Sequence, residues 1–161
     1  MRVRELMTQP VYSCNIHDRA NEAAQIMWEH DCGVVPVVDG GGRVVGVLTD
    51  RDLCMAVHFQ NRPLTEIPVA GVMAQQVQTC IADDDVLEAE RVMAERQIHR
   101  LPVVNDEGSL IGILSLADVA RQARGTPGRQ REEAVAQLAN TVTAISEPHG
   151  ATSAATRAHS K

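Results

Sequence analysis

The sequence contains two copies of one pattern, 66 residues apart. Shifting the chain by that distance aligns Val3 to Val57 with Val69 to Ala123 without a gap. The matched pairs include Met7 with Met73, Cys14 with Cys80, Asp18 with Asp84, Pro36 with Pro102, and Asp52 with Asp118. A unit of about 57 residues with one small sheet leaves a face of that sheet uncovered, and two copies can bury these faces together. The repeat therefore predicts two like units paired about a pseudo-two-fold axis.

Each copy has the pattern strand, helix, strand, strand, helix. In the first copy, Ala20, Ala23 and Met27 lie on one face of a helix, after Asp18. The apolar runs Val34 to Val38 and Val44 to Leu48 then flank a glycine-rich turn, which is typical of a hairpin. We expect Asp18, and the run Asp83 to Asp85 in the second copy, to cap their helices. The predicted fold class is α/β (α+β), with two repeats of β-α-β-β-α type.

The chain divides into five predicted segments. They are a first repeat over 1–59, a linker over 60–66, a second repeat over 67–123, a C-terminal helical extension over 124–146 and a disordered tail over 147–161. In the extension, Val135, Leu138, Val142 and Ile145 fall on one stripe, which predicts a helix that packs on its own domain or on a dimer mate.

Composition argues against several classes of function. The net charge of −6 and the presence of only three aromatic residues disfavour nucleic-acid binding. Apolar stretches are too short to cross a membrane and the N-terminus does not resemble a signal peptide, so we expect a soluble cytoplasmic protein. The cysteine and histidine spacings favour reduced thiols and no metal site. Without a nucleophile elbow or a Walker-type loop, we expect no enzyme and no catalytic cofactor.

One short motif carries the chemistry, and it occurs once in each repeat. Gly46 to Asp52 and Gly112 to Asp118 both read glycine, two apolar residues, a hydroxyl residue, two variable residues and aspartate. A hydroxyl residue followed three positions later by a carboxylate forms a capping box at a helix start. The same groups also suit a nucleotide, with the helix start near a phosphate and the carboxylate accepting hydrogen bonds from a ribose diol. The motif alone leaves both interpretations open.

This tandem arrangement resembles a pair of CBS domains, also called a Bateman module. The resemblance covers residues 1 to about 123 and includes Val35 to Asp39, Leu101 to Asn105 and the two glycine-to-aspartate motifs. It implies a regulatory module that binds an adenine nucleotide (AMP, ADP, ATP, NAD or S-adenosylmethionine) in clefts between the repeats. It also implies a homodimer and an unidentified regulated protein as partners.

Two nucleotide sites follow from this resemblance. The first would use Ser13, Val34, Val35, Pro36, Thr49, Arg51 and Asp52, and the second Thr79, His99, Arg100, Leu101, Pro102, Ser115 and Asp118. Arg51 and Arg100 are the candidate phosphate contacts, one in each site. Two alternatives are a ligand-free interaction module, in which the motifs act only as helix caps, and a thiol- or metal-dependent sensor that uses Cys14 and Cys80.

Overall fold

The computed structural model describes residues 1–148 and contains two β-α-β-β-α units followed by a helix. The first unit consists of β1 (Cys14–Asn15), α1 (Ala20–Glu29), β2 (Val34–Val38), β3 (Val44–Thr49) and α2 (Asp50–Gln60). The second consists of β4 (Cys80–Ile81), α3 (Val86–Arg96), β5 (Arg100–Val104), β6 (Leu110–Ser115) and α4 (Leu116–Gly125). The helix α5 (Arg129–Ser146) follows, and most of the tail predicted to be disordered lies outside the described residues.

Each unit holds one three-stranded sheet. The first strand pairs in parallel with the second, which pairs antiparallel with the third, giving the orders β1-β2-β3 and β4-β5-β6. The registers of the two sheets match, since Val34 lies opposite Thr49 and Arg100 lies opposite Ser115. The leading strands are only two residues long.

Local hydrogen bonds explain the turns, and they correct one prediction about the caps. Asp85 caps α3 by accepting the Leu87 N–H at 2.9 Å, as expected. Asp18 does not cap α1, whose N-cap is Arg19, but accepts the Asn15 N–H at 2.6 Å. Asp84 likewise accepts the Ile81 N–H, so these two aspartates stabilise the turn after the leading strand instead.

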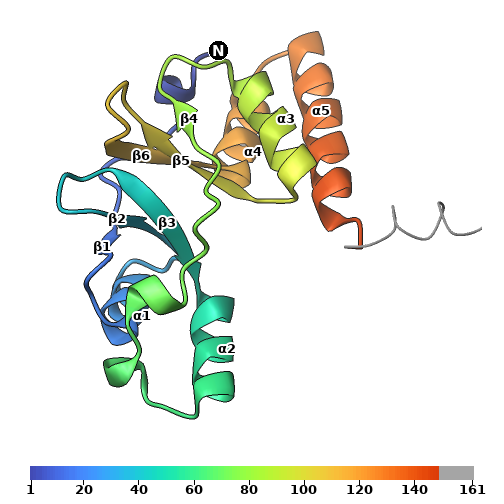
Figure 1. Ribbon diagram of the computed structural model, residues 1–161. Helices are drawn as coiled ribbons and strands as arrows, with labels where there is room; N and C mark the ends of the chain where they lie inside the picture. The colour runs from blue at the N-terminus through green and yellow to red at the C-terminus, as the bar shows by residue number, and fades with distance from the viewer. Residues whose placement is uncertain (149–161) are drawn as a thin grey trace, which may run out of the picture.

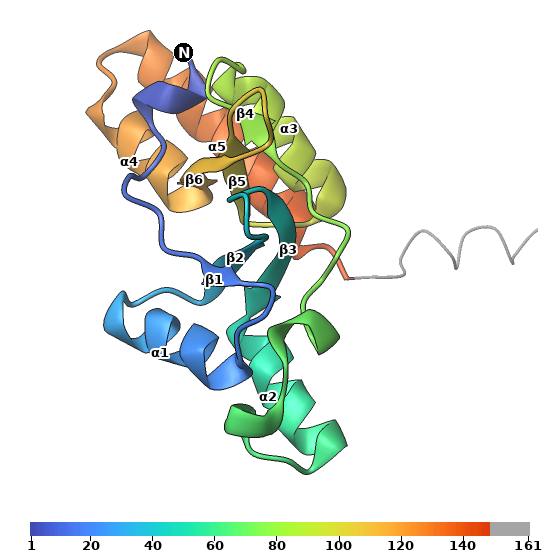
Figure 2. The same ribbon diagram turned by 60° about the vertical axis from the view of Figure 1, so that its left-hand side comes forward.

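The segment that precedes the first strand of each repeat, residues 1–13 before β1 and 67–79 before β4, is here called its lead-in. Each lead-in packs against the other repeat (Figures 1 and 2). The 3-10 helix η1 (Val3–Glu5) lies against the second repeat, with Val3 in its core. The chain then runs past β6, where the Thr8 N–H donates to the Ile113 carbonyl at 2.8 Å, before it reaches β1. In the second copy, η3 (Val69–Gly71) places Val69 in the first core, and Ala74 pairs with Val47 of β3. Each repeat therefore needs the lead-in of the other to complete its core and its sheet edge.

The helix α5 covers one repeat only. It packs against α3 and α4, and Ile145 joins the core of the second repeat (Figure 1). In the part of the chain that the structure describes, no counterpart of α5 covers the corresponding helices α1 and α2, where Trp28 is 86% exposed and Phe59 77%. The predicted C-terminal helix is thus present, and its placement makes the two repeats inequivalent. No helix within residues 1–148 is long and apolar enough to span a membrane.

Candidate functional site

The first motif forms a capping box at the start of α2. The Thr49 hydroxyl accepts the Asp52 N–H at 3.1 Å, and Asp52 Oδ2 accepts the Thr49 N–H at 2.9 Å and the Thr49 hydroxyl at 2.7 Å. Within residues 1–148, the second carboxylate oxygen, Oδ1, accepts no hydrogen bond. Capping therefore uses one oxygen of the half-buried Asp52 and leaves the other available.

The second motif forms the same box and adds contacts from elsewhere. Asp118 Oδ2 accepts the Ser115 N–H at 2.8 Å and the Ser115 hydroxyl at 2.5 Å. Its other oxygen, Oδ1, accepts the Thr8 hydroxyl at 3.3 Å and pairs with Arg121. Asp118 is only 5% exposed. The lead-in of the first repeat thus contacts the carboxylate of the second repeat's motif.

A cavity of about 160 Å³ lies beside this contact, and both repeats form its walls. Its lining residues are Thr8, Pro10, Val11, Tyr12, His30, Cys32, Val34, Pro36, Arg100 and Ile113. The walls combine aliphatic side chains with one guanidinium and with the rings of Tyr12 and His30, whose centroids lie 3.3 Å apart in a stacked pair. None of these lining residues is acidic, so Arg100 gives the cavity a positive charge.

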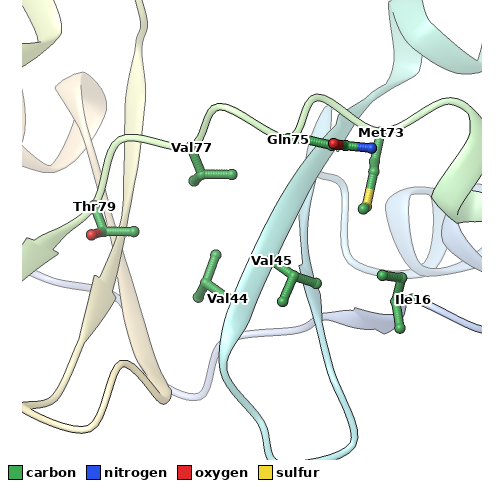
Figure 3. A pocket seen from close by; sticks show the side chains of 7 residues that line it. All are labelled: Ile16, Val44, Val45, Met73, Gln75, Val77 and Thr79. Atoms are coloured by element: carbon green, nitrogen blue, oxygen red, sulfur yellow. The ribbon is translucent and has the colours of Figure 1, made fainter.

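A larger and more open pocket of about 550 Å³ lies between the lead-in of the second repeat and β3 (Figure 3). It is lined by Ile16, Val44, Val45, Met73, Gln75, Val77 and Thr79. These residues are aliphatic or uncharged, and neither motif aspartate lines the pocket. The smaller cavity is the better candidate site, because it presents the Arg100 guanidinium, which can hold a phosphate, and lies beside the contact between Thr8 and Asp118.

The structure distributes the residues of the two expected sites among different environments. Val34 and Pro36 of the first set and Arg100 of the second line the same cavity. Thr79 lines the open pocket of Figure 3 instead. Of the remaining residues, Val35 and Leu101 lie in the two cores at 0% exposure, Pro102 is buried, Ser13 is half-buried, and Arg51 and His99 are exposed. Val35 and Leu101 can therefore border a ligand only through their backbone.

Sequence reasoning missed Thr8, His30 and Ile113 as cavity residues. Thr8 and Ile113 come together because the first lead-in pairs with β6 of the other repeat. His30 follows α1 and reaches the cavity by stacking on Tyr12. The sequence contains one signal for two of these residues: Thr8 and His30 differ from their counterparts in the second copy, Ala74 and Arg96, at otherwise matched positions.

The matched cysteines lie in the cores. Burial raises the pKa of Cys14 to about 11 and that of Cys80 to about 12, with Asp18 and Asp84 adding to the effect. Such thiols stay protonated at neutral pH, which makes them poor nucleophiles and poor metal ligands. Among the described residues, no group of three or more His, Cys, Asp or Glu side chains is arranged to hold a metal ion.

The fold and the site define a tandem pair of β-α-β-β-α repeats that share their sheet edges and a cavity. The chain belongs to the CBS domain family, whose model matches residues 3–58 and 69–125. It is 36% identical over 118 residues to the CBS domain-containing protein YhcV of Bacillus subtilis, covering 73% of this chain and 82% of that protein.

Two solved structures show the same architecture. The CBS domain pair of protein MJ0100, in complex with 5-methylthioadenosine and S-adenosyl-L-methionine, matches with a TM-score of 0.70 at 27% identity, over 78% of this chain and 97% of that one. The CBS domain protein PAE2072 from Pyrobaculum aerophilum, complexed with AMP, matches with a TM-score of 0.67 at 27% identity, over 74% and 90% of the two chains. Both relatives bind ligands that contain adenosine.

Proposed function

We propose that this protein is a non-enzymatic regulatory sensor that binds an adenine nucleotide in the cavity between its repeats. The observation that carries the proposal is the mixed origin of the walls: Val34 and Pro36 come from the first repeat, and Arg100 and Ile113 come from the second. A ligand in this position contacts both repeats, so its binding energy depends on their relative arrangement. That dependence is what a sensor needs, since a ligand shifts only an equilibrium whose two states it binds differently.

Each part of a nucleotide has a chemical match at the site. The Thr8 hydroxyl already donates to Asp118 Oδ1, and a ribose hydroxyl can take its place on that oxygen. Aliphatic walls and the Tyr12 and His30 rings suit the faces of a base. The Arg100 guanidinium suits a phosphate, which it can hold with two parallel hydrogen bonds.

The charge of the cavity favours an anionic nucleotide over S-adenosylmethionine, which carries a sulfonium cation. Arg100 repels a positive group, none of the described lining residues is acidic, and Asp118, which Thr8 contacts, is already paired with Arg121. We therefore propose AMP or a related nucleotide as the ligand. A cavity of about 160 Å³ is small against the roughly 300 to 1,000 Å³ of most ligand sites. We therefore expect the cavity to widen on binding, and the stacked Tyr12 and His30 rings are part of the wall that would move.

Calorimetric titration with AMP, ATP, NAD and S-adenosylmethionine tests this function. We expect AMP to bind at least ten times more tightly than S-adenosylmethionine, and Arg100→Ala to weaken AMP binding at least tenfold. Arg124→Ala, at an exposed position in the last turn of α4, is the matched control and should bind AMP normally. Absence of heat and of a melting shift with every nucleotide at millimolar concentration would contradict the proposal.

The capping boxes require a separate test, because a ligand-free interaction module would also contain them. Their presence therefore does not distinguish a nucleotide site from a helix cap. Ser115→Ala removes the cap hydroxyl and should lower the free energy of unfolding by about 1 kcal/mol. Asp118→Ala should lower stability and, in addition, weaken AMP binding at least tenfold. If both variants lose stability and neither changes AMP affinity, the aspartate acts only as a helix cap.

We also propose that two copies of the chain associate through α1 and α2. In the second repeat, α5 covers the face that corresponds to these helices, and the positions of Trp28 and Phe59 hold the small residues Ala94 and Gly125 there. Within residues 1–148, no counterpart of α5 covers the same face of the first repeat, which carries two large exposed rings. Light scattering should give a dimer mass for the native chain and a monomer mass for Trp28→Arg; a monomeric native chain would exclude this interface.

A further inference from the structure

A third cavity, which shares no lining residue with the cavity beside Thr8, lies beneath α5. It has a volume of about 420 Å³, in the range of small-molecule sites, which is roughly 300 to 1,000 Å³. Its walls come from the N-terminal segment and from α3, α4 and α5. The lining residues are Met1, Leu6, Asp85, Val86, Leu87, Glu90, Val119, Gln122, Ala123, Thr126, Gln130, Ala134 and Gln137. None of the residues that line the cavity beside Thr8 contributes to it.

The unusual member of this set is Glu90. It is 3% exposed, although it sits on a helix whose other buried residues are Val86, Ala89 and Met93. The matching position of the first repeat holds Ala24, so the fold of the repeat does not itself require an acid there. A buried carboxylate is unfavourable unless it is well paired, and burial raises the pKa of Glu90 above its ordinary value.

Glu90 is poorly satisfied by the protein. Its Oε2 accepts the Thr141 hydroxyl at 3.3 Å, but that hydroxyl has one hydrogen and lies closer, at 3.1 Å, to the Gln137 carbonyl oxygen. Within residues 1–148, Oε1 accepts no hydrogen bond, and it is not sealed away from solvent. One carboxylate oxygen of a nearly buried side chain therefore remains free at the wall of the cavity.

Nothing that lines the cavity neutralises Glu90. Asp85, the other acidic lining residue, accepts the Leu87 N–H and lies 3.6 Å from the Met1 amino group, so that amino group already has a partner. Among residues 1–148, no Arg or Lys side chain lines the cavity, and its other polar groups are three glutamine amides and the Thr126 hydroxyl. The interior thus combines one unpaired carboxylate, further hydrogen-bond acceptors and aliphatic surface.

We propose that this cavity binds a primary ammonium cation that carries an aliphatic chain. The ammonium group donates to Glu90, and the side-chain oxygens of Gln122 and Gln137 are available as further acceptors. Leu6, Val119 and Ala134 form the apolar surface for the chain. Because Ala134 and Gln137 belong to α5, the bound cation also holds that helix against α3 and α4.

Butylammonium is the probe that tests the site, with butan-1-ol as its uncharged counterpart. Calorimetry at pH 7.5 should show saturable binding of butylammonium and at least tenfold weaker binding of butan-1-ol. Glu90→Gln should reduce butylammonium affinity at least tenfold. Glu88→Gln removes the same charge from an exposed position of α3 and should leave the affinity unchanged. Loss of affinity in both variants would mean that net charge, rather than Glu90, attracts the cation.

Two more measurements separate a ligand site from a structural contact. The pKa of Glu90 is higher in the folded chain than its ordinary value of 4.5, so ionisation of Glu90 destabilises the fold at pH values above 4.5. Glu90→Gln removes this charge and should therefore melt no lower than the native chain at pH 7.5. Ala134→Leu keeps the carboxylate but fills the cavity, and should also reduce butylammonium affinity at least tenfold. Absence of saturable binding to the native chain, or full affinity in Glu90→Gln or Ala134→Leu, would overturn the proposal. AMP binding should be unchanged in both variants, so this test is independent of the nucleotide site.

Discussion

At the residue scale, two glycines and two methionines explain part of the repeated pattern. A Cβ on Gly112 would lie 2.8 Å from the Met7 sulfur and 3.3 Å from the Thr8 carbonyl oxygen. A Cβ on Gly46 would meet Met73 in the same way and would lie 3.2 Å from the Ala74 carbonyl oxygen. Each glycine therefore leaves room for the lead-in that arrives from the other repeat.

Alanine at these positions should destabilise the protein. We expect Gly46→Ala and Gly112→Ala each to lower the free energy of unfolding by about 1 to 3 kcal/mol, because the incoming backbone must shift. Gly40→Ala, where nothing lies within 4 Å of the new atom, should change it by less than about 0.5 kcal/mol. Urea denaturation measures all three. Equal effects at Gly40 and Gly46 would show that the close approach is unimportant.

The core cysteines make a second prediction at this scale. The folded pKa values of about 11 for Cys14 and about 12 for Cys80 lie above the ordinary value of 9.0, so the folded state holds these protons longer than the unfolded state does. The stabilisation is complete below pH 9 and is lost as pH rises through 11 to 12. Urea midpoints should therefore fall above pH 9, and less so in Cys14→Ala/Cys80→Ala.

Alkylation provides a direct check of these thiols. At pH 8, iodoacetamide should modify the exposed Cys54 long before Cys14 or Cys80, as followed by mass spectrometry of the folded protein. Alkylation of Cys14 at the rate of Cys54 would contradict the burial and would favour the thiol-sensor interpretation.

At the scale of elements, the exchange of lead-ins is the main determinant of how the repeats combine. Val3 is fully buried in the core of the second repeat, and its N–H donates to the Asp84 carbonyl at 3.0 Å. Val69 occupies the equivalent place in the first repeat and donates to the Asp18 carbonyl at the same distance. The repeats are thus joined by core contacts as well as by the linker.

A single truncation tests this exchange. Val3→Ala should lower the free energy of unfolding by about 1 to 3 kcal/mol through lost burial. Hydrogen exchange should then rise in β5 and β6, far along the chain, and stay nearly unchanged in β2 and β3. Val57→Ala, at a partly exposed position, is the control. Faster exchange confined to the first repeat would show that Val3 stabilises its own unit.

At the scale of the whole molecule, the internal symmetry is broken by the segments around the two cores. The helix α5 lies on one repeat only. Val34 and Arg100 occupy matching positions of the two repeats and line the same cavity beside Thr8, yet one side chain is aliphatic and the other is charged. Two copies of one unit thus produce surfaces and sites that differ.

Ligand binding should stabilise both repeats together. At an AMP concentration of one hundred times its Kd, the free energy of unfolding should rise by about 2.7 kcal/mol. Protection from hydrogen exchange should increase both in the lead-in around Thr8 and in β6, because both border the cavity. Protection limited to one repeat would contradict a site shared between them.

The sequence by itself determined the order of elements, the two hairpins and the starts of α2, α3 and α4, since these depend on periodicity, glycine turns and caps within a few residues. The resemblance to CBS domains also named Val34, Pro36 and Arg100, which line the cavity, as candidate ligand contacts. Only the tertiary structure decided which repeat each lead-in packs against and where α5 lies. It also brought Thr8 and Ile113 together at the cavity. The physical reason is that both cores present nearly the same apolar surface to Val3. Local patterns show that such a residue is buried, whereas the geometry of the paired sheets selects which core receives it.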